Sequence, residues 1–190
     1  MLAVMVPLVM LMVGPLPPQV GYKVDCQAAL DFTTSVQPVG VFTNMRFTEE
    51  HAYGYTIKLW RAHGCIFGLF LASEGLAGDT PTGLLENVIY DPRTGKLSFT
   101  AKLTIGLVSM RAHDSMPSRD SYEFHGYLAG KSISGNLSHS TRLTPEFKPE
   151  QQKVLLRYSK PEAEGMRSAK TYGKWLEETR EVLRLRGPKW

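Results

Sequence analysis

Short apolar runs with a period of two dominate the chain between residues 38 and 158. The clearest is residues 97–105, where Leu, Phe, Ala, Leu and Ile alternate with Ser, Thr, Lys and Thr. Successive side chains of a β-strand point to opposite faces, so this alternation predicts a strand with one buried and one exposed face. Further runs of strand character lie at residues 41–48, 53–61, 65–72, 84–90, 122–128, 133–139 and 153–158. We therefore expect about eight short strands.

The links between these runs have the composition of tight turns. His63-Gly64 separates the second run from the third, and residues 91–96 (DPRTGK) separate the fourth from the fifth. Pro presets the backbone of a turn, and Gly adopts a positive φ without steric cost. Links of hairpin length join antiparallel neighbours, which indicates a mainly β fold. We expect an antiparallel meander closed as a small barrel, which would remove exposed strand edges, or alternatively a β-sandwich.

The period changes after residue 160. One face of a C-terminal amphipathic helix is predicted by the spacing i, i+3, i+4, i+7 and i+11 of Tyr172, Trp175, Leu176, Thr179 and Leu183. Pairs at i+3 are expected on its polar flank, between Glu177 and Arg180 and between Glu181 and Arg184.

The third run, residues 65–72, is apolar on both faces. One face can fill the barrel and the other needs a cover, so we expect Trp175 and Leu176 to pack the helix there. In the alternative interpretation this helix contacts a membrane surface or a partner protein instead.

An apolar stretch opens the chain, with MLAVMVPLVMLMVG at residues 1–14. About 13 residues are too few to span a bilayer as a helix but match the apolar part of a secretory signal peptide. Residues 1–28 are therefore expected to be an export segment, although no basic residue precedes the run. A buried N-terminal strand or helix is the alternative. The expected organisation continues with a β-barrel domain over residues 29–159 and a helical extension over residues 160–190, in a periplasmic or secreted protein.

The chain contains two cysteines, Cys26 and Cys65. In an oxidising compartment they could form a disulfide, and two unpaired buried thiols are the alternative. Two cysteines without a CxxC spacing give no indication of a metal or redox site.

Composition and charge exclude several classes of function. The 190 residues are 43% hydrophobic and 21% charged, which suits a packed domain rather than a disordered chain. The net charge of +4 is concentrated at the end of the chain, since residues 160–190 hold eight Lys and Arg against five Asp and Glu. We therefore expect no nucleic-acid partner, which would need a broad basic face.

No motif for a cofactor, a metal or a catalytic nucleophile was found. The five histidines have neither i, i+4 nor i, i+2 ligand spacing, and neither a G-x-S-x-G elbow nor a glycine-rich phosphate loop leading into a helix occurs. We therefore predict no cofactor and no metal, and favour a noncatalytic function.

Several short motifs between residues 40 and 140 follow one another in a recognisable order. They are Thr43-Asn44-Met45, Glu49-Glu50-His51, Tyr53-Gly54-Tyr55, Ala72-Ser73-Glu74-Gly75-Leu76, Leu97-Ser98-Phe99, Phe124-His125-Gly126 and Ile133-Ser134-Gly135-Asn136-Leu137. This order resembles a loose group of small exported bacterial β-barrel proteins with no assigned function. The resemblance implies an exported location and a β fold, and it supplies no catalytic residues. The strand count is similar to that of calycin-type barrels, which is a fold analogy only.

These features favour an exported binding or interaction module, whose partner is a small apolar ligand or an envelope protein. An eight-stranded barrel has an interior just large enough for side chains or one small ligand. The candidate ligand-binding residues are Phe99, Tyr122 and Phe124 in the interior, with Arg111 and His113 in the long connection of residues 106–121. The alternatives are an isomerase- or cyclase-like barrel enzyme that uses polar groups at the barrel mouth, and a structural or envelope-associated protein.

Overall fold

The computed structural model describes residues 26, 30–76, 80–103, 107–111, 114–117, 119–142, 145–146, 148–166 and 169–186, with the backbone alone for 76, 107–111, 114–117 and 186. The strands are β1 (Gln37–Thr43), β2 (Arg46–Phe47), β3 (His51–Ala62), β4 (Cys65–Leu76), β5 (Thr82–Tyr90), β6 (Lys96–Lys102), β7 (Leu107–Arg111), β8 (Asp114–Pro117), β9 (Asp120–Ala129), β10 (Ser132–Thr141) and β11 (Glu150–Tyr158). The helices are α2 (Lys160–Glu164) and α3 (Tyr172–Arg186).

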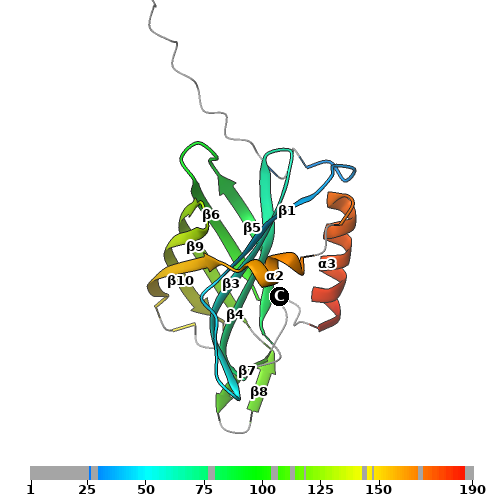
Figure 1. Cartoon of the computed structure of the whole chain (residues 1–190). Coiled ribbons are helices and arrows are strands. Elements are labelled where there is room, and N and C mark those ends of the chain that lie inside the picture. Colours follow the sequence, from blue (N-terminus) through cyan, green and yellow to red (C-terminus); the bar gives the residue numbers. More distant parts are fainter. Residues whose placement is uncertain are drawn as a thin grey trace, which may run out of the picture.

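Eight of the strands close into an antiparallel barrel. Their order around the barrel is β1, β3, β4, β5, β6, β9, β10 and β11, and β1 pairs with both β3 and β11 to complete it (Figure 1). The strands therefore follow one another around the barrel in chain order, which confirms the predicted meander and excludes the β-sandwich. β2 pairs with β3 outside this ring, and β7 and β8 form a separate two-stranded ladder.

The turn at His63-Gly64 is the predicted two-residue hairpin. Both residues have positive φ, at 46° and 79°. That pattern belongs to the primed turns, whose twist matches that of the strands they join. β3 and β4 consequently pair without interruption from His51 opposite Leu76 to Ala62 opposite Cys65.

The first strand differs from the prediction, which placed it at residues 41–48. The structure has β1 ending at Thr43 and a separate β2 beginning at Arg46. The break occurs because side chains replace the ladder there: Asn44 Oδ1 accepts a hydrogen bond from the Tyr55 N–H at 2.7 Å, and Thr43 Oγ1 accepts one from the Met45 N–H at 3.0 Å. The strand prediction was wrong because side-chain competition for backbone groups is not visible in a periodicity.

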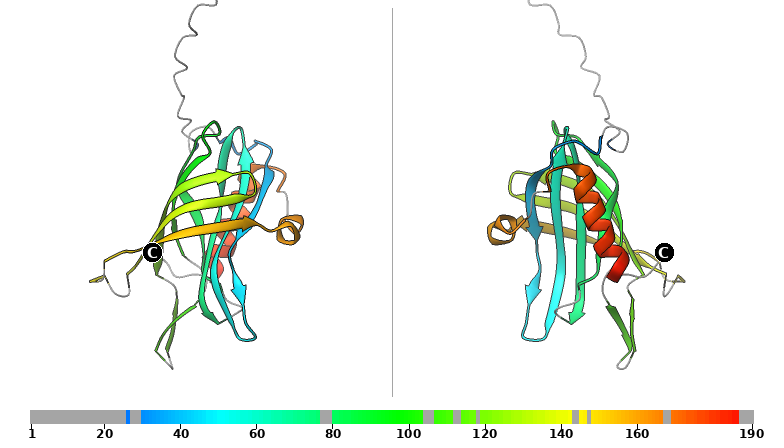
Figure 2. Two further views of the ribbon diagram at one scale, coloured as in Figure 1. Left: turned by 60° about the vertical axis from the view of Figure 1, so that its left-hand side comes forward. Right: turned by 90° about the vertical axis from the view of Figure 1, so that its right-hand side faces the viewer.

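α3 covers the outside of β3 and β4, as Figure 2 shows in its right-hand view. Trp175 packs on Trp60 and Phe67 with ring centroids 5.3 and 4.6 Å apart, and Leu176 is buried in the same cluster. Phe67 lies on the outer face of β4, whereas its neighbours Ile66 and Phe70 belong to the barrel core. The predicted division of the third run between barrel and helix is thus confirmed.

The start of α3 is also tied to the segment that precedes β1. The N–H groups of Tyr172 and Gly173 donate to the carbonyls of Thr34 and Phe32, at 2.8 and 3.0 Å. A Cβ on Gly173 would come within 2.8 Å of the Phe32 ring, so this close approach depends on glycine. Residues near both ends of the described chain therefore fix the helix on the barrel together.

Candidate functional site

The three interior residues singled out from the sequence lie in the packed core of the barrel. Phe99, Tyr122 and Phe124 are all at most 2% exposed. The rings of Phe99 and Phe124 stack with centroids 5.1 Å apart, and Tyr122 contacts the ring of Phe70 at 4.8 Å. Their packing partners are other side chains of the barrel, and a ligand-binding role for these residues remains a prediction.

Gly126 and Gly135, the small interior residues, lie opposite one another on β9 and β10. The Phe124 ring fills the space above them, since a Cβ on Gly126 would lie 2.6 Å from its Cζ atom and 2.7 Å from Cα of Gly135. At this level of the barrel, the space left by the missing side chains of Gly126 and Gly135 is occupied by the Phe124 ring and not by a ligand.

Replacement of Gly126 by Ala should therefore lower the free energy of unfolding by about 1–3 kcal/mol, the usual cost of overpacking a core. Gly75→Ala on β4 is the matched control, because a Cβ there meets no atom of the described structure within 4 Å. Urea unfolding of the two variants measures the difference. Equal stability of both variants would contradict the close packing of Phe124 over Gly126.

The other two candidate residues belong to the long connection. Arg111 is the last residue of β7, where the structure describes the backbone alone. His113 lies outside the described residues. Instead of one irregular loop, the connection contains the β7–β8 hairpin, which Figures 1 and 2 show projecting beyond the end of the barrel.

A pocket outside the barrel arises where β4 and β5 separate. These strands pair at three positions only, the last being Leu69 opposite Leu84. Beyond that point β5 also shifts register against β6 between Glu86 and Ile89, and Asn87 within the shift has a φ of 51°. A bulge of this kind bends its strand and breaks pairing locally. The barrel wall therefore has a seam between β4 and β5.

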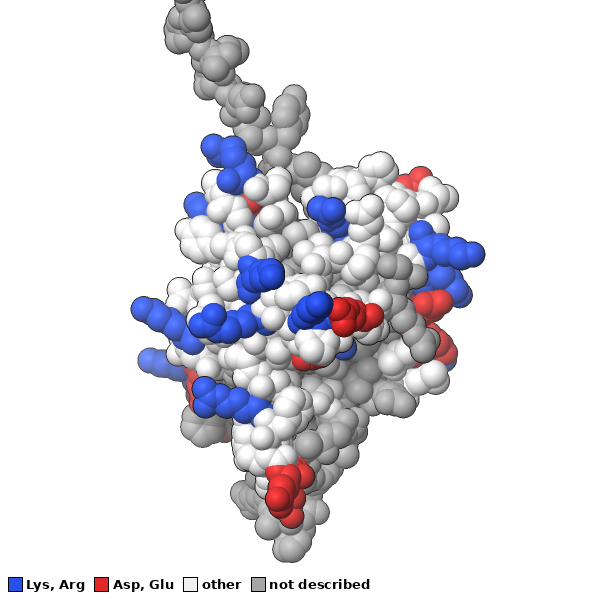
Figure 3. Space-filling view, viewed as in Figure 1, with Lys and Arg blue, Asp and Glu red and all other residues white. Residues whose placement is uncertain are grey.

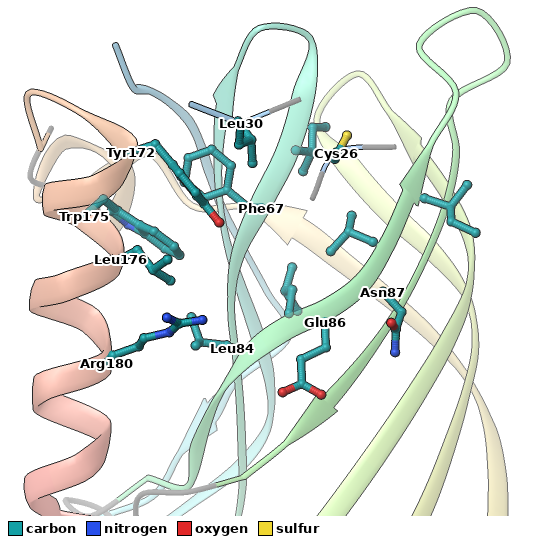
Figure 4. A pocket seen from close by; sticks show the side chains of 14 residues that line it. Cys26, Leu30, Phe67, Leu84, Glu86, Asn87, Tyr172, Trp175, Leu176 and Arg180 are labelled. Carbon is teal, nitrogen blue, oxygen red and sulfur yellow. The ribbon is translucent and has the colours of Figure 1, made fainter. Parts of the chain in front are cut away.

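The pocket at this seam, here called the seam pocket, has a volume of about 570 Å³. Figure 4 shows α3 forming one wall and β5 the other. Ile66 and Leu85, which belong to the barrel core, are among its lining residues, so the pocket borders the core at the seam. Its remaining lining residues are Cys26, Leu30, Phe67, Leu84, Glu86, Asn87, Val88, Ile89, Tyr172, Trp175, Leu176 and Arg180.

The N-terminal side of this pocket is held by the Cys26–Cys65 disulfide, whose Cα atoms lie 5.4 Å apart. Of the two alternatives left open by the sequence, the structure has the disulfide. Cys65 begins β4 and is fully buried, and Cys26 lines the pocket. The cross-link therefore fixes part of a pocket wall to the barrel.

Charges stand at the polar side of the seam pocket. Arg180 points from α3 towards β5, where Glu86 also extends from the strand (Figure 4). The predicted pair of Glu177 with Arg180 was wrong, because Glu177 Oε2 instead accepts from Lys174 Nζ at 3.2 Å. The other predicted pair is present, with Glu181 accepting two hydrogen bonds from Arg184.

A second group of polar residues lies at one end of the barrel, here called the mouth cluster: Tyr55, Glu74, Asp120, Tyr122, His139, Glu150 and Gln152. Nε2 of His139 lies 2.9 Å from Oδ1 of Asp120, and its ring stacks on Tyr122 with centroids 4.5 Å apart. Gln152 donates to the Tyr55 hydroxyl at 2.5 Å. This arrangement orients one imidazole firmly between a carboxylate and a phenol ring.

The pKa of His139 reflects two opposing effects. Burial lowers it, but the hydrogen bond and charge of Asp120, with the charges of Glu74 and Glu150, outweigh burial and hold the pKa above its ordinary value. Burial, strengthened by Glu74, raises the pKa of Tyr122, whose phenol therefore stays neutral. Chemically, the His139–Asp120 pair can hold and exchange a proton, with Asp120 positioning the imidazole.

A histidine whose folded pKa is raised stabilises the fold below its unfolded pKa, and this contribution is lost as pH rises through the folded pKa. Asp120→Asn should lower the pKa of His139, because burial then acts with less opposition. NMR titration of the His139 ring measures this shift. Glu123→Gln on the outer face of β9 removes the same charge as a control and should leave the His139 titration unchanged. An unaltered pKa in Asp120→Asn would contradict the proposed pairing.

The sequence interpretation did not include the mouth cluster, although the chain carries a signal for part of it. Asp120 precedes Tyr122 by two positions, and His139 follows Leu137 by two. The period-two pattern of residues 133–139 places His139 on the interior face, and the pattern of residues 122–128 would place Asp120 there too if the strand is extended back to residue 120, where β9 begins. The seam pocket had no such signal, since it depends on how β5 departs from β4.

Neither the surface charge nor a metal site or membrane-spanning helix indicates a further candidate site within the described residues. Lys and Arg side chains stand in separate groups divided by uncharged surface on the face seen in Figure 3. Within the described ranges, no three His, Cys, Asp or Glu side chains gather as a metal site, and none of the helices is long and apolar enough to cross a membrane. Comparison of the chain with models of protein families, with curated proteins and with solved structures finds no match in any of the three.

Proposed function

We propose that this protein is an exported, noncatalytic binding module that holds a small apolar ligand in the seam pocket. The observation that carries the proposal is the pocket itself. Its volume of about 570 Å³ lies in the range typical of small-molecule sites, and most of its lining residues have apolar or aromatic side chains, accompanied by Glu86, Asn87 and Arg180. The eight-stranded meander is analogous to calycin-type barrels, but here the proposed site lies between the barrel wall and α3.

Export is supported by the apolar residues 1–14 together with the disulfide, because disulfides persist mainly in oxidising compartments. Residues 1–25 and 27–29 lie outside the described residues, so the expected export segment at 1–28 remains a prediction. The disulfide adds one constraint to the proposal. An export segment that is removed must end before Cys26, short of the expected boundary at residue 28, because the mature protein must keep Cys26 to form the cross-link.

Binding of N-phenyl-1-naphthylamine, an uncharged apolar probe whose fluorescence rises in apolar surroundings, tests this function. The wild-type protein should bind the probe, and Leu84→Trp should weaken binding about tenfold or more, because the indole occupies the pocket. Leu155→Trp on β11 introduces the same side chain at an exposed position away from the pocket and should bind as the wild type does. Absence of binding, or equal binding by both variants, would contradict the proposal and favour recognition of an envelope protein.

A second candidate function, a barrel enzyme acting at the mouth, is favoured by one observation, the His139–Asp120 pair beside Tyr122. A histidine oriented by a carboxylate is a general base in many enzymes. This role requires that a reagent can reach His139. Diethyl pyrocarbonate should then modify His139 in the folded protein, which mass spectrometry detects. If His139 stays unmodified, the catalytic role is excluded.

A further inference from the structure

The ion pairs along α3 do not include the basic side chain of Arg180. Glu177 and Glu178 both contact Lys174, at 3.2 and 3.8 Å, and Glu181 contacts Arg184 at 2.8 Å. All three acids of the helix are therefore engaged with two of its cations. Among the described side chains, no ion pair or hydrogen bond involves Arg180; Arg186, the fourth cation of the helix, has only its backbone described.

Arg180 is an exposed residue of α3, and its side chain lines the seam pocket. It lines the pocket together with Leu84 and Leu176 below the rings of Trp175 and Tyr172 (Figure 4). Its charge also reaches the hydroxyl of Tyr172: burial raises the pKa of Tyr172, and the positive charge of Arg180 partly offsets that effect. The pocket therefore has a positive charge on its α3 side.

Glu86 on the β5 wall is the opposing charge. Although it faces the same pocket, no ion pair joins it to Arg180 in the described structure. An anionic group bound at Arg180 would therefore be repelled to some extent by Glu86. A cationic group would be attracted by Glu86 and repelled by Arg180. Substitution of Arg180 and of Glu86 therefore tests the charge preference of the pocket by removing its positive and its negative charge in turn.

We infer that the seam pocket selects an anionic amphipath, a ligand with a hydrocarbon or ring body and a carboxylate. Its apolar body lies against Phe67, Leu84 and Trp175, and its carboxylate pairs with the guanidinium of Arg180. Guanidinium groups match carboxylates in a planar, two-point geometry. This inference rests on the proposed function and adds the chemical class of the ligand to it.

Competition between N-phenyl-1-naphthylamine and three ligands of equal chain length tests the inference: decanoate, 1-decanol and decylammonium. At neutral pH decanoate should displace the probe at about threefold to tenfold lower concentration than 1-decanol does, the range expected for a partly exposed charge pair. Arg180→Gln should remove this advantage, and Glu86→Gln should enlarge it. Arg184→Gln, which removes a cation already paired with Glu181, is the matched control and should change nothing.

The outcomes separate the inference from the proposed function. If 1-decanol displaces the probe and decanoate does so no better, the pocket binds apolar ligands without selecting an anion, and the inference is wrong while the proposed function stands. A preference for decylammonium that is lost in Glu86→Gln would overturn the inference in favour of a cationic ligand. If the probe does not bind at all, the proposed function fails and the inference fails with it.

Discussion

Reduction of the Cys26–Cys65 disulfide should lower the free energy of unfolding by about 4 kcal/mol. The cross-link joins residues 39 positions apart, and closing a loop of that length restricts the unfolded chain by about this amount. It also fixes Cys26 in the wall of the seam pocket, so reduction should weaken binding of the naphthylamine probe as well.

Urea unfolding with and without reductant measures the effect on stability. Cys26→Ser is the control, since a variant that cannot form the disulfide should have the same stability under both conditions. A thiol-specific mass label applied to the unreduced wild-type protein should add nothing. Two labels on the folded protein, or a midpoint that does not respond to reductant, would contradict the disulfide.

Trp175→Ala should destabilise the protein by about 3–5 kcal/mol, the usual cost of truncating a buried tryptophan. Trp175 is only 5% exposed and contacts the rings of Trp60, Phe67 and Tyr172. Its removal leaves a cavity between α3 and the barrel, and the apolar surface of β3 and β4 becomes accessible. Thermal unfolding should show a lower Tm, and a dye that binds apolar surface should report the exposed strands.

Leu185→Ala is the matched control on the same helix, because Leu185 is 67% exposed and its truncation should change the stability little. Binding to anionic vesicles tests the alternative use of the helix. If Trp175→Ala keeps the wild-type Tm but loses vesicle binding, α3 contacts a membrane surface instead of the barrel.

Period two and turn composition were sufficient to predict most of the barrel. In β6 the buried residues are Leu97, Phe99 and Ala101, as the alternation in the sequence requires. Such a prediction succeeds because strand alternation is local: each side chain's face follows from its position in the chain. The helix prediction succeeded for the same reason, since Trp175, Leu176 and Leu183 are all buried on one side of α3.

The local sequence pattern was insufficient to predict the structure where two groups can pair with the same partner. The expected strand at residues 41–48 is broken where the side chains of Thr43 and Asn44 accept hydrogen bonds from backbone N–H groups. The expected pair of Glu177 with Arg180 is replaced by one with Lys174, three residues earlier on the same helix. Both alternatives satisfy the spacing rules, and three-dimensional geometry selects between them.

The sequence by itself therefore determined the strand faces, the hairpin turns and the apolar side of the C-terminal helix, because these depend on residues close together in the chain. Only the tertiary structure decided that the ring closes between β1 and β11, that Phe124 occupies the space over Gly126 and Gly135, and that β4 and β5 separate beyond Leu84. The candidate sites belong to this second group. His139 meets Asp120, and Arg180 faces β5, through contacts between segments that a linear pattern cannot place beside one another.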